Sequence, residues 1–213
     1  DADTGLLHAS PTQQDVHWLA PDNLLVEWVL QEANAEKLSV TIDTKLHDYD
    51  ITDNGLLGIL RGTALDWPPN SPVQAEVAPA VWLESYTGDG PVTGWESDAR
   101  LSFFAAINAA NQGDAAQAEA RYTAALEQFD GTGFAGGVAA GQYATADLAV
   151  ALLAGKHLDQ PVNDAIVRRL LALQTDDGGF AAHYTATGAA DGADTLTTAY
   201  ALLALYALRQ PMQ

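Results

Sequence analysis

The sequence predicts an all-α protein of stacked helix hairpins, forming a partial or open α/α toroid, with an irregular insert near residues 53–95 that can contain β-structure. Three observations predict this fold: apolar residues recur at helical spacing, short breaks divide the helices into pairs, and a weak repeat links the pairs. With 213 residues and 48% hydrophobic content, the chain can bury one substantial core. Residues 1–213 are therefore expected to form a single domain.

The first expected hairpin lies near the N-terminus. Asp22 opens a helix that carries Leu25 and Trp28, and after Ala33 a second helix carries Ile42 on its apolar face. Because only a short break separates the two helices, they are expected to pack against each other.

Residues 53–95 lose the helical periodicity. The short apolar runs at 56–60 and 77–83 fit strands or extended loops better than helices, because frequent prolines remove backbone donors and fix φ. The prolines that interrupt this stretch are Pro68, Pro69, Pro72, Pro79 and Pro91.

A second hairpin follows the insert. Asp98 opens a helix that runs to about Asn111, where Gly113 ends it. A further helix begins at Asp114 and continues to about Phe129. The glycine between them predicts a tight connection.

The last third of the chain contains three more expected helices. Apolar residues recur at helical spacing within 148–155 and again within 166–173. In the final helix Leu196, Tyr200 and Leu203 lie on one stripe, and alanine and leucine fill most of the other faces, which predicts extensive burial.

A weak internal repeat connects these helices. Each copy has a glycine followed by an apolar or aromatic residue, then a polar stretch, an acidic residue and an apolar helix. A hairpin that cannot bury its own apolar stripe must stack on its neighbours. The three copies are Gly5-Leu6 before Asp22, Gly133-Phe134 before Asp147, and Gly179-Phe180 before Asp194.

The best-preserved copy, LQTDDGGF at 173–180 followed by DTLTTAYALLAL at 194–205, resembles the repeat of the terpenoid cyclase and protein prenyltransferase superfamily. The resemblance covers some 40 residues and implies an α/α-toroid fold more than an activity. The family's prenyltransferase zinc site and its thioester both require cysteine, which this chain lacks. Neither Asp1-Ala2-Asp3-Thr4 nor Asp176-Asp177 matches the acidic motif of the squalene-type cyclases.

Composition excludes several classes of function. The chain has 28 acidic against 9 basic side chains, a net charge of −19, so nucleic acids and anionic membranes are disfavoured as partners. No apolar run approaches the roughly 20 residues of a membrane span, so membrane insertion is not expected. The acidic surface, together with a start at Asp1 without methionine, is consistent with an extracellular or cell-envelope protein.

One group of candidate site residues lies near the start of the first helix. Asp22 is a candidate catalytic carboxylate, and His17 and Trp18 are candidate substrate contacts, because sugar rings stack on aromatic side chains while carboxylates bond their hydroxyls. The alternative is that Trp18 and Trp28 belong to the core and that Asp22 caps its helix.

A second group lies in the loop after residue 180. His183 and Asp194 form a candidate acid–base pair, with Tyr184 beside them as a substrate contact. The alternative is a capping aspartate next to a surface histidine. A calcium site built from Asp176, Asp177 and Asp191 is a further alternative, although their spacing matches no compact calcium loop.

Trp95 and Tyr143 complete the candidate substrate contacts, since both lie in loops near helix starts. Two functions remain open. The first is a non-catalytic extracellular interaction module whose groove binds a glycan or protein partner. The second is a carbohydrate-active hydrolase or lyase with paired carboxylates in the cleft. No cofactor or bound metal is assigned, and the sequence defines no oligomeric state.

Overall fold

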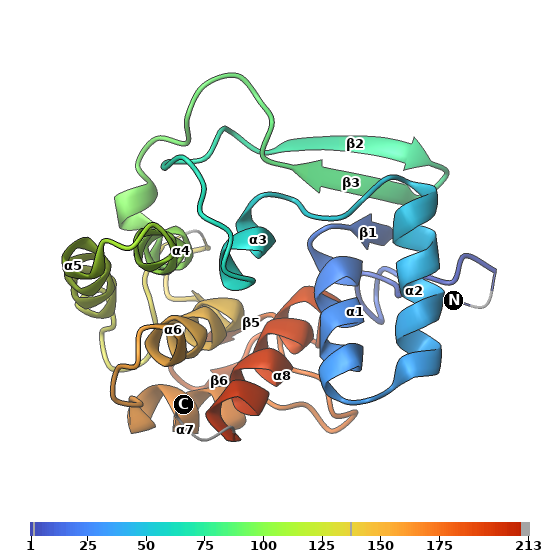
Figure 1. Cartoon of the computed structure of the whole chain (residues 1–213). Coiled ribbons are helices and arrows are strands. Elements are labelled where there is room, and N and C mark those ends of the chain that lie inside the picture. Colours follow the sequence, from blue (N-terminus) through green and yellow to red (C-terminus); the bar gives the residue numbers. More distant parts are fainter. Residues whose placement is uncertain (2, 137, 210–213) are drawn as a thin grey trace.

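The computed structural model describes residues 1, 3–136 and 138–209 and corrects the all-α prediction, because the described chain is a mixed α/β structure in which helices dominate (Figure 1). Eight α-helices are accompanied by two three-stranded sheets within the described residues. The helices are α1 (Asp22–Glu32), α2 (Glu36–Asp48), α3 (Leu56–Leu60), α4 (Ala99–Asn111), α5 (Ala115–Leu126), α6 (Thr145–His157), α7 (Asp164–Leu171) and α8 (Thr195–Arg209).

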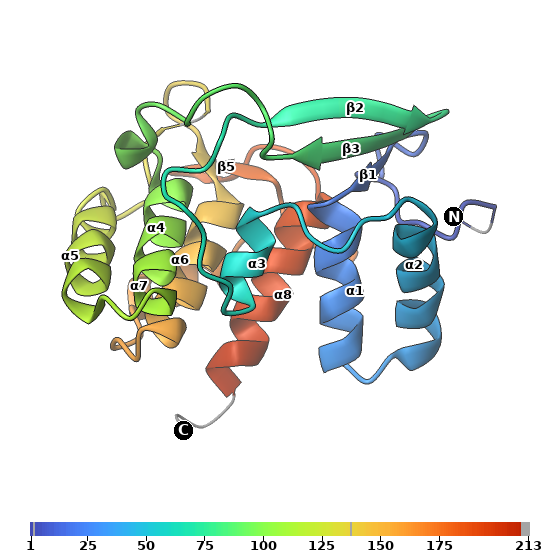
Figure 2. The same ribbon diagram turned by 45° about the horizontal axis from the view of Figure 1, so that its top comes forward.

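Four helices form a continuous row in the order α4, α6, α8 and α1, each in contact with the next. Figure 2 shows that all four begin at the same end of the molecule, below the strands. Helices α2, α5 and α7 pack on the outside of α1, α4 and α6, respectively. The row therefore directs the N-terminal ends of four helices toward one region.

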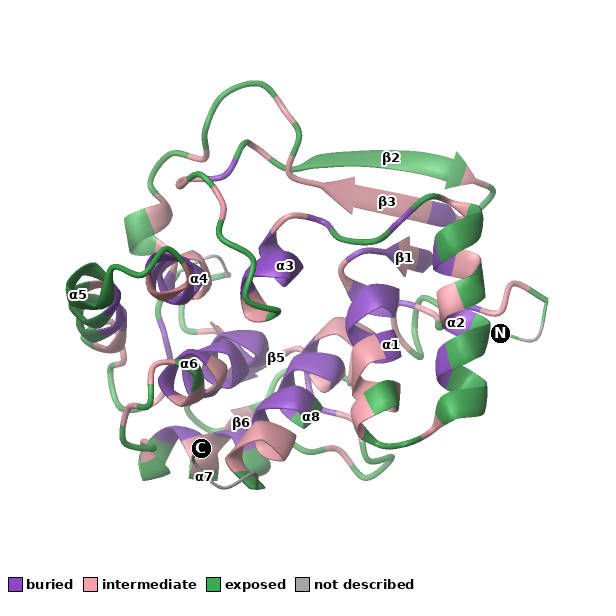
Figure 3. Cartoon of the chain, in the orientation of Figure 1, coloured by how far each residue is buried: buried purple, intermediate pink, exposed green. Residues whose placement is uncertain are grey.

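The burial of each helix follows its sequence. Helix α6 is apolar on nearly every face, and its residues from Leu148 to Leu152 are all buried, because α4 and α8 cover it on two sides. Helix α7 is amphipathic and buries only Ile166 and Leu170. Figure 3 shows the same contrast between the buried inner row and the largely exposed α2 and α5.

The first sheet consists of β1 (His17–Leu19), β3 (Val81–Ser85) and β2 (Val73–Ala78) in that order. Strand β1 pairs in parallel with β3, with Trp18 opposite Trp82, and β2 pairs antiparallel with β3. Strands β2 and β3 lie within residues 53–95, the stretch without helical periodicity in which β-structure was expected. Strand β1 was not predicted from the sequence. It has only three residues, which is too short to show an alternating pattern.

The second sheet joins β4 (Tyr143–Ala144), β5 (His183–Thr185) and β6 (Gly188–Ala189) in that order, with antiparallel pairing throughout. Strand β4 leads directly into α6, and Tyr143 pairs with Tyr184 across the sheet. These strands have two or three residues each, so their pairing depends on the packing of the adjoining helices and not on local sequence.

The run at 56–60 was expected to be extended and is instead the short helix α3. Asn54 begins this turn by accepting a hydrogen bond from the amide of Leu57 at 3.0 Å. Helix α4 then holds the chain that follows, because the Asn108 side chain bonds both the amide and the carbonyl of Leu65 at 2.8 Å. These hydrogen bonds join residues far apart in the sequence, so the local sequence does not predict them. They favour a helical turn over a strand at residues 56–60.

The N-terminal segment is tied to the start of α8 and to α1. The amide of Thr195 donates to the carbonyl of Ala9 at 2.9 Å. The buried side chain of Asn23 bonds the amide and carbonyl of Leu7 and the carbonyl of Trp18. The segment therefore forms one edge of the region above the helix row.

The repeated glycine–apolar pairs have a common structural role. Leu6, Phe134 and Phe180 are each 1% exposed and belong to the same hydrophobic core. Phe134 and Phe180 also form isolated bridges, with Phe129 and Gln174 respectively. A side chain at Gly179 would put its Cβ 2.6 Å from that of Ala193, so the close approach of these segments requires glycine.

Candidate functional site

A cavity of about 730 Å³ lies between the N-terminal ends of α1, α4 and α8 and the β2–β3 hairpin. Its wall combines carboxylates, one arginine, one histidine and several aromatic rings. The lining residues with functional groups or aromatic rings include Trp18, Asp22, Gln74, Glu84, Tyr86, Asp98, Arg100, Phe104, His183, Asp191, Asp194 and Tyr200. The cavity is thus the place where residues far apart in the sequence meet.

Asp22 is the most unusual of these residues. It is only 6% exposed, at the first position of α1, yet the helix is preceded by Pro21 and has no side-chain cap. Burial, and then the nearby carboxylates of Asp194 and Glu84, hold the pKa of Asp22 well above its ordinary value. Asp22 therefore keeps its proton to a higher pH than an exposed aspartate does.

Asp98 and Asp194 lie one position earlier, immediately before the first residue of α4 and of α8, and both act as caps. Asp98 accepts a hydrogen bond from the amide of Leu101 at 3.0 Å, and Asp194 accepts one from the amide of Thr197 at 2.6 Å. Burial raises the pKa of Asp194, while the amide and hydroxyl of Thr197 and then His183 act in the opposite direction. The capping alternative is therefore correct for Asp194 and incorrect for Asp22.

His183 is paired with Asp191 and not with Asp194. Its ring Nδ1 lies 2.6 Å from Oδ2 of Asp191, and its backbone amide donates to Oδ1 of the same carboxylate at 2.8 Å. Because a carboxylate oxygen only accepts, Nδ1 is the donor in this contact. Both side chains are about 40% exposed at the cavity edge, so this pair can exchange protons with a ligand.

Arg100 provides the positive charge of the cavity wall. Its Nε lies 2.9 Å from Oδ1 of Asp147, which lies in the first turn of α6 and whose side chain is 8% exposed. Burial opposes the charge of Arg100, but the contact with Asp147 outweighs it and raises the pKa of the guanidinium. The arginine therefore compensates a buried carboxylate and also faces the cavity.

Two aromatic side chains give the cavity apolar surface. Trp18 on β1 is half-buried, with its ring 5.9 Å from that of Trp82. Tyr86 follows β3 directly, and burial followed by the charge of Glu84 raises the pKa of its phenol to about 12, so it remains a neutral donor. Glu84 is held by Gln74, whose Nε2 donates to its Oε2 at 3.2 Å.

Several predicted site residues lie away from the cavity lining. Trp95 stands edge-on to Trp67 at 5.4 Å, outside the cavity. Tyr143 stacks on the fully buried Tyr184 at 5.3 Å, and the two hydroxyls bond Asp130 and the carbonyl of Thr132, respectively. His17 is 4% exposed and stacks on His8 behind β1. The residue types alone do not show whether these side chains pack inside the protein or contact a ligand.

Arg100, Glu84 and Tyr86 line the cavity but were not identified from the sequence. Arg100 had one available signal, since it is among only nine basic residues and directly follows a predicted helix start. Glu84 and Tyr86 had none, because they face the cavity only through the pairing of β3 with β1 and β2.

The alternative calcium site is not assembled. Asp177 accepts hydrogen bonds from Thr175 and from the amide of Gly179, and Asp191 is paired with His183. In the part of the chain that the structure describes, Asp176, Asp177 and Asp191 do not form a group with metal-ligand spacing.

The described helices include none that is both long and apolar enough to cross a lipid bilayer, in agreement with the prediction of no membrane insertion. Comparisons of the chain with models of protein families, with curated proteins and with solved structures found no match.

Proposed function

We propose that the cavity binds an oligosaccharide or a similar hydroxyl-rich, uncharged ligand. The observation that supports this proposal is the combination of half-buried Trp18 and Tyr86 with the carboxylates of Glu84 and Asp191 and the buried Asp22, whose pKa is raised, around one cavity of about 730 Å³. Sugars present apolar ring faces together with hydroxyls that both donate and accept hydrogen bonds, which matches this mixture of groups.

The electrostatics favour an uncharged ligand over an anion. Five carboxyl groups line the cavity, namely those of Asp22, Glu84, Asp98, Asp191 and Asp194. The whole chain carries a net charge of −19, so an anionic ligand would be repelled during approach. An extracellular or envelope setting belongs to the same proposal, since a strongly acidic surface favours solubility outside the cell.

The binding proposal is tested by isothermal titration calorimetry against a panel of neutral oligosaccharides. We expect one panel member to bind, and Trp18→Ala to weaken that binding by about tenfold or more, because it removes the aromatic surface of β1. Trp95→Ala is the matched control, since Trp95 is also a partly exposed tryptophan but lies outside the cavity lining. Equal losses in the two variants, or no binding across the panel, would contradict the proposal.

A second candidate function, a hydrolase or lyase acting on the bound glycan, is favoured by the side chains that line the cavity. Burial raises the pKa of the Asp22 carboxyl, which makes it the candidate acid, and His183, oriented by the contact of its Nδ1 with Asp191, is the candidate base. An acid and a base on one cavity are what glycosidic bond cleavage needs: the acid protonates the leaving oxygen, and the base activates water or removes a ring proton.

Turnover separates this candidate from simple binding. We expect Asp22→Asn and His183→Gln each to remove most of the product formed from a glycan that still binds. A new reducing end without a double bond indicates hydrolysis, and a new double bond indicates elimination. If wild-type protein binds a glycan and yields neither product, the cavity is a binding site only, which is the non-catalytic interaction module.

A further inference from the structure

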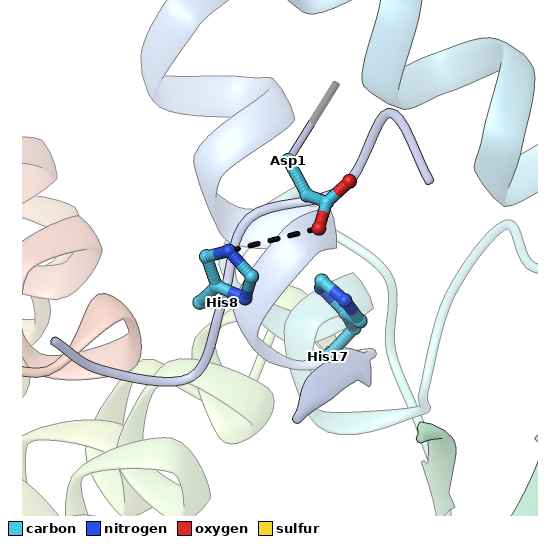
Figure 4. Close-up of side chains that lie close together, drawn as sticks. All are labelled: Asp1, His8 and His17. Atoms are coloured by element: carbon cyan, nitrogen blue, oxygen red, sulfur yellow. Dashed lines mark ion pairs between the residues drawn. The ribbon is translucent and has the colours of Figure 1, made fainter. Parts of the chain in front are cut away.

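Three potential metal ligands converge behind β1, outside the cavity described above. Asp1, His8 and His17 each offer one ligand atom, and these atoms lie within 4.8 Å of one another. Nε2 of His8 is 3.8 Å from Oδ2 of Asp1, and the two imidazole rings stack with centroids 4.7 Å apart. Figure 4 shows the three side chains gathered in one small volume at the junction of the N-terminal segment and β1.

The two histidines carry buried nitrogen atoms that need partners. Nδ1 of His8 and Nδ1 of His17 are both shielded from solvent and have no hydrogen-bond partner among the described residues. His17 as a whole is only 4% exposed. A buried polar atom left without a partner costs about 1–3 kcal/mol, so two of them at one location indicate a missing interaction partner.

The carboxylate is already oriented for such a partner. Oδ1 of Asp1 accepts hydrogen bonds from the amides of Asp3 and Thr4 at 2.7 and 3.0 Å, so Oδ2 is the oxygen turned toward His8. These two bonds fix the carboxylate without using the oxygen that faces the histidines.

Both histidines are held by their backbones. The amide of His17 donates to the carbonyl of Ala80 at 2.9 Å, and the carbonyl of His8 accepts a hydrogen bond from the hydroxyl of Thr195. Ala9, the next residue, also pairs with Val16 through a 2.8 Å bond. The rings therefore meet on a fixed frame that links the N-terminal segment, β1 and α8.

We propose that Asp1, His8 and His17 bind one divalent transition-metal ion, with Zn²⁺ as the best fit. Two imidazoles and one carboxylate form a donor set that suits zinc and related first-row metals, whereas Ca²⁺ and Mg²⁺ prefer oxygen alone. Three protein ligands leave a further position for water, which can reach the site because the side chain of His8 is 31% exposed. The bound ion joins the N-terminal segment to β1.

Calorimetric titration of chelator-treated protein with ZnCl₂ tests this site directly. We expect binding of one equivalent, and we expect His8→Gln and His17→Gln each to weaken it by at least about tenfold, since even loss of an outer partner of a metal ligand has that effect. His47→Gln is the matched control, because His47 also lies 3.3 Å from an aspartate oxygen, that of Asp43, but on the exposed face of α2 without a third ligand.

The ring nitrogen resonances of the histidines provide a second measurement on the unmodified protein. Addition of Zn²⁺ is expected to shift the ¹⁵N signals of His8 and His17 and to leave that of His47 unchanged. If His17→Gln does not fold, this spectrum and the His8→Gln titration decide the question. No stoichiometric binding, or binding that His47→Gln weakens as much as His8→Gln does, would overturn the proposal.

Discussion

Asp22 and Asp147 occupy comparable places in the molecule, and their surroundings differ. Each lies in the first turn of a helix of the inner row, and each residue is 6% exposed. Asp147 is 2.9 Å from the guanidinium of Arg100, whereas Asp22 has Asp194 and Glu84 as its charged neighbours. Burial raises the pKa of both carboxyls, but at Asp147 the charge of Arg100 acts against this rise, whereas at Asp22 the neighbouring carboxylates add to it.

The difference separates two electrostatic environments in the cavity wall. A buried carboxylate that loses its arginine partner is strongly destabilising, so Arg100 and Asp147 depend on each other across α4 and α6. A buried carboxylate among other carboxylates costs stability, and strongly perturbed pKa values concentrate at functional sites. The α1 side of the cavity is therefore where the proposed function places its acid.

The largest expected effect comes from removing the compensating charge. Arg100→Met leaves Asp147 buried without its partner, and breaking a buried pair in this way costs about 3–5 kcal/mol of the free energy of unfolding. Urea unfolding measures the loss, and the additional change Asp147→Asn should recover part of it. Lys45→Met is the control, because its pair with Asp48 is exposed and contributes about 0–1 kcal/mol.

The opposite change is expected at Asp22. Asp22→Asn removes a charge that burial disfavours. The free energy of unfolding at neutral pH should therefore rise by about 0.5–2 kcal/mol, the usual range for a single stabilising substitution. A loss of stability would show that Asp22 has a compensating partner and would remove the contrast with Asp147.

The pH dependence gives the sign of this effect. The pKa of Asp22 is raised in the folded state above its ordinary value of 3.8, so its stabilising contribution is present below that value and is lost as pH rises through the raised pKa. Thermal melting should therefore give similar temperatures for wild type and Asp22→Asn near about pH 4, with the variant increasingly more stable toward about pH 8. A constant difference would contradict the titration of Asp22.

The smallest expected effect is at the exposed pair. Asp191→Asn weakens the 2.6 Å contact with His183, but both side chains are about 40% exposed, so the free energy of unfolding should change by no more than about 1 kcal/mol. The same change should reduce turnover of any glycan substrate, because the His183 ring loses the carboxylate that orients it through Nδ1. A large loss of stability would show that the contact between His183 and Asp191 holds the fold together, which would contradict this prediction.

Local sequence was a good guide to the long helices. The predicted starts at Asp98 and Asp114 are confirmed as caps that accept from the amides of Leu101 and Gln117. The final apolar helix is confirmed as α8. Each of these features depends on residues within one or two turns of each other, where side-chain periodicity and capping act directly.

Local sequence did not predict the elements that depend on contacts between residues far apart in the chain. The strands β1 and β4–β6 are too short for an alternating pattern, and α3 depends on side chains of α4 that bind the chain after it. The candidate site shows the same limit. Trp18, Asp22, His183 and Asp194 do meet at one cavity, but Trp95, Tyr143 and Tyr184 pack elsewhere.

The sequence by itself determined the long helices, the acidic character of the chain and the presence of carboxylates at the helix starts, because periodicity, charge and capping are properties of neighbouring residues. Only the tertiary structure decided which charged side chains surround each buried carboxylate. Arg100 reaches Asp147 across 47 positions of the chain, whereas the charged groups that act on Asp22 among the described residues are the carboxylates of Asp194 and Glu84. Electrostatic compensation depends on distance in space, and the packing of the helix row sets that distance.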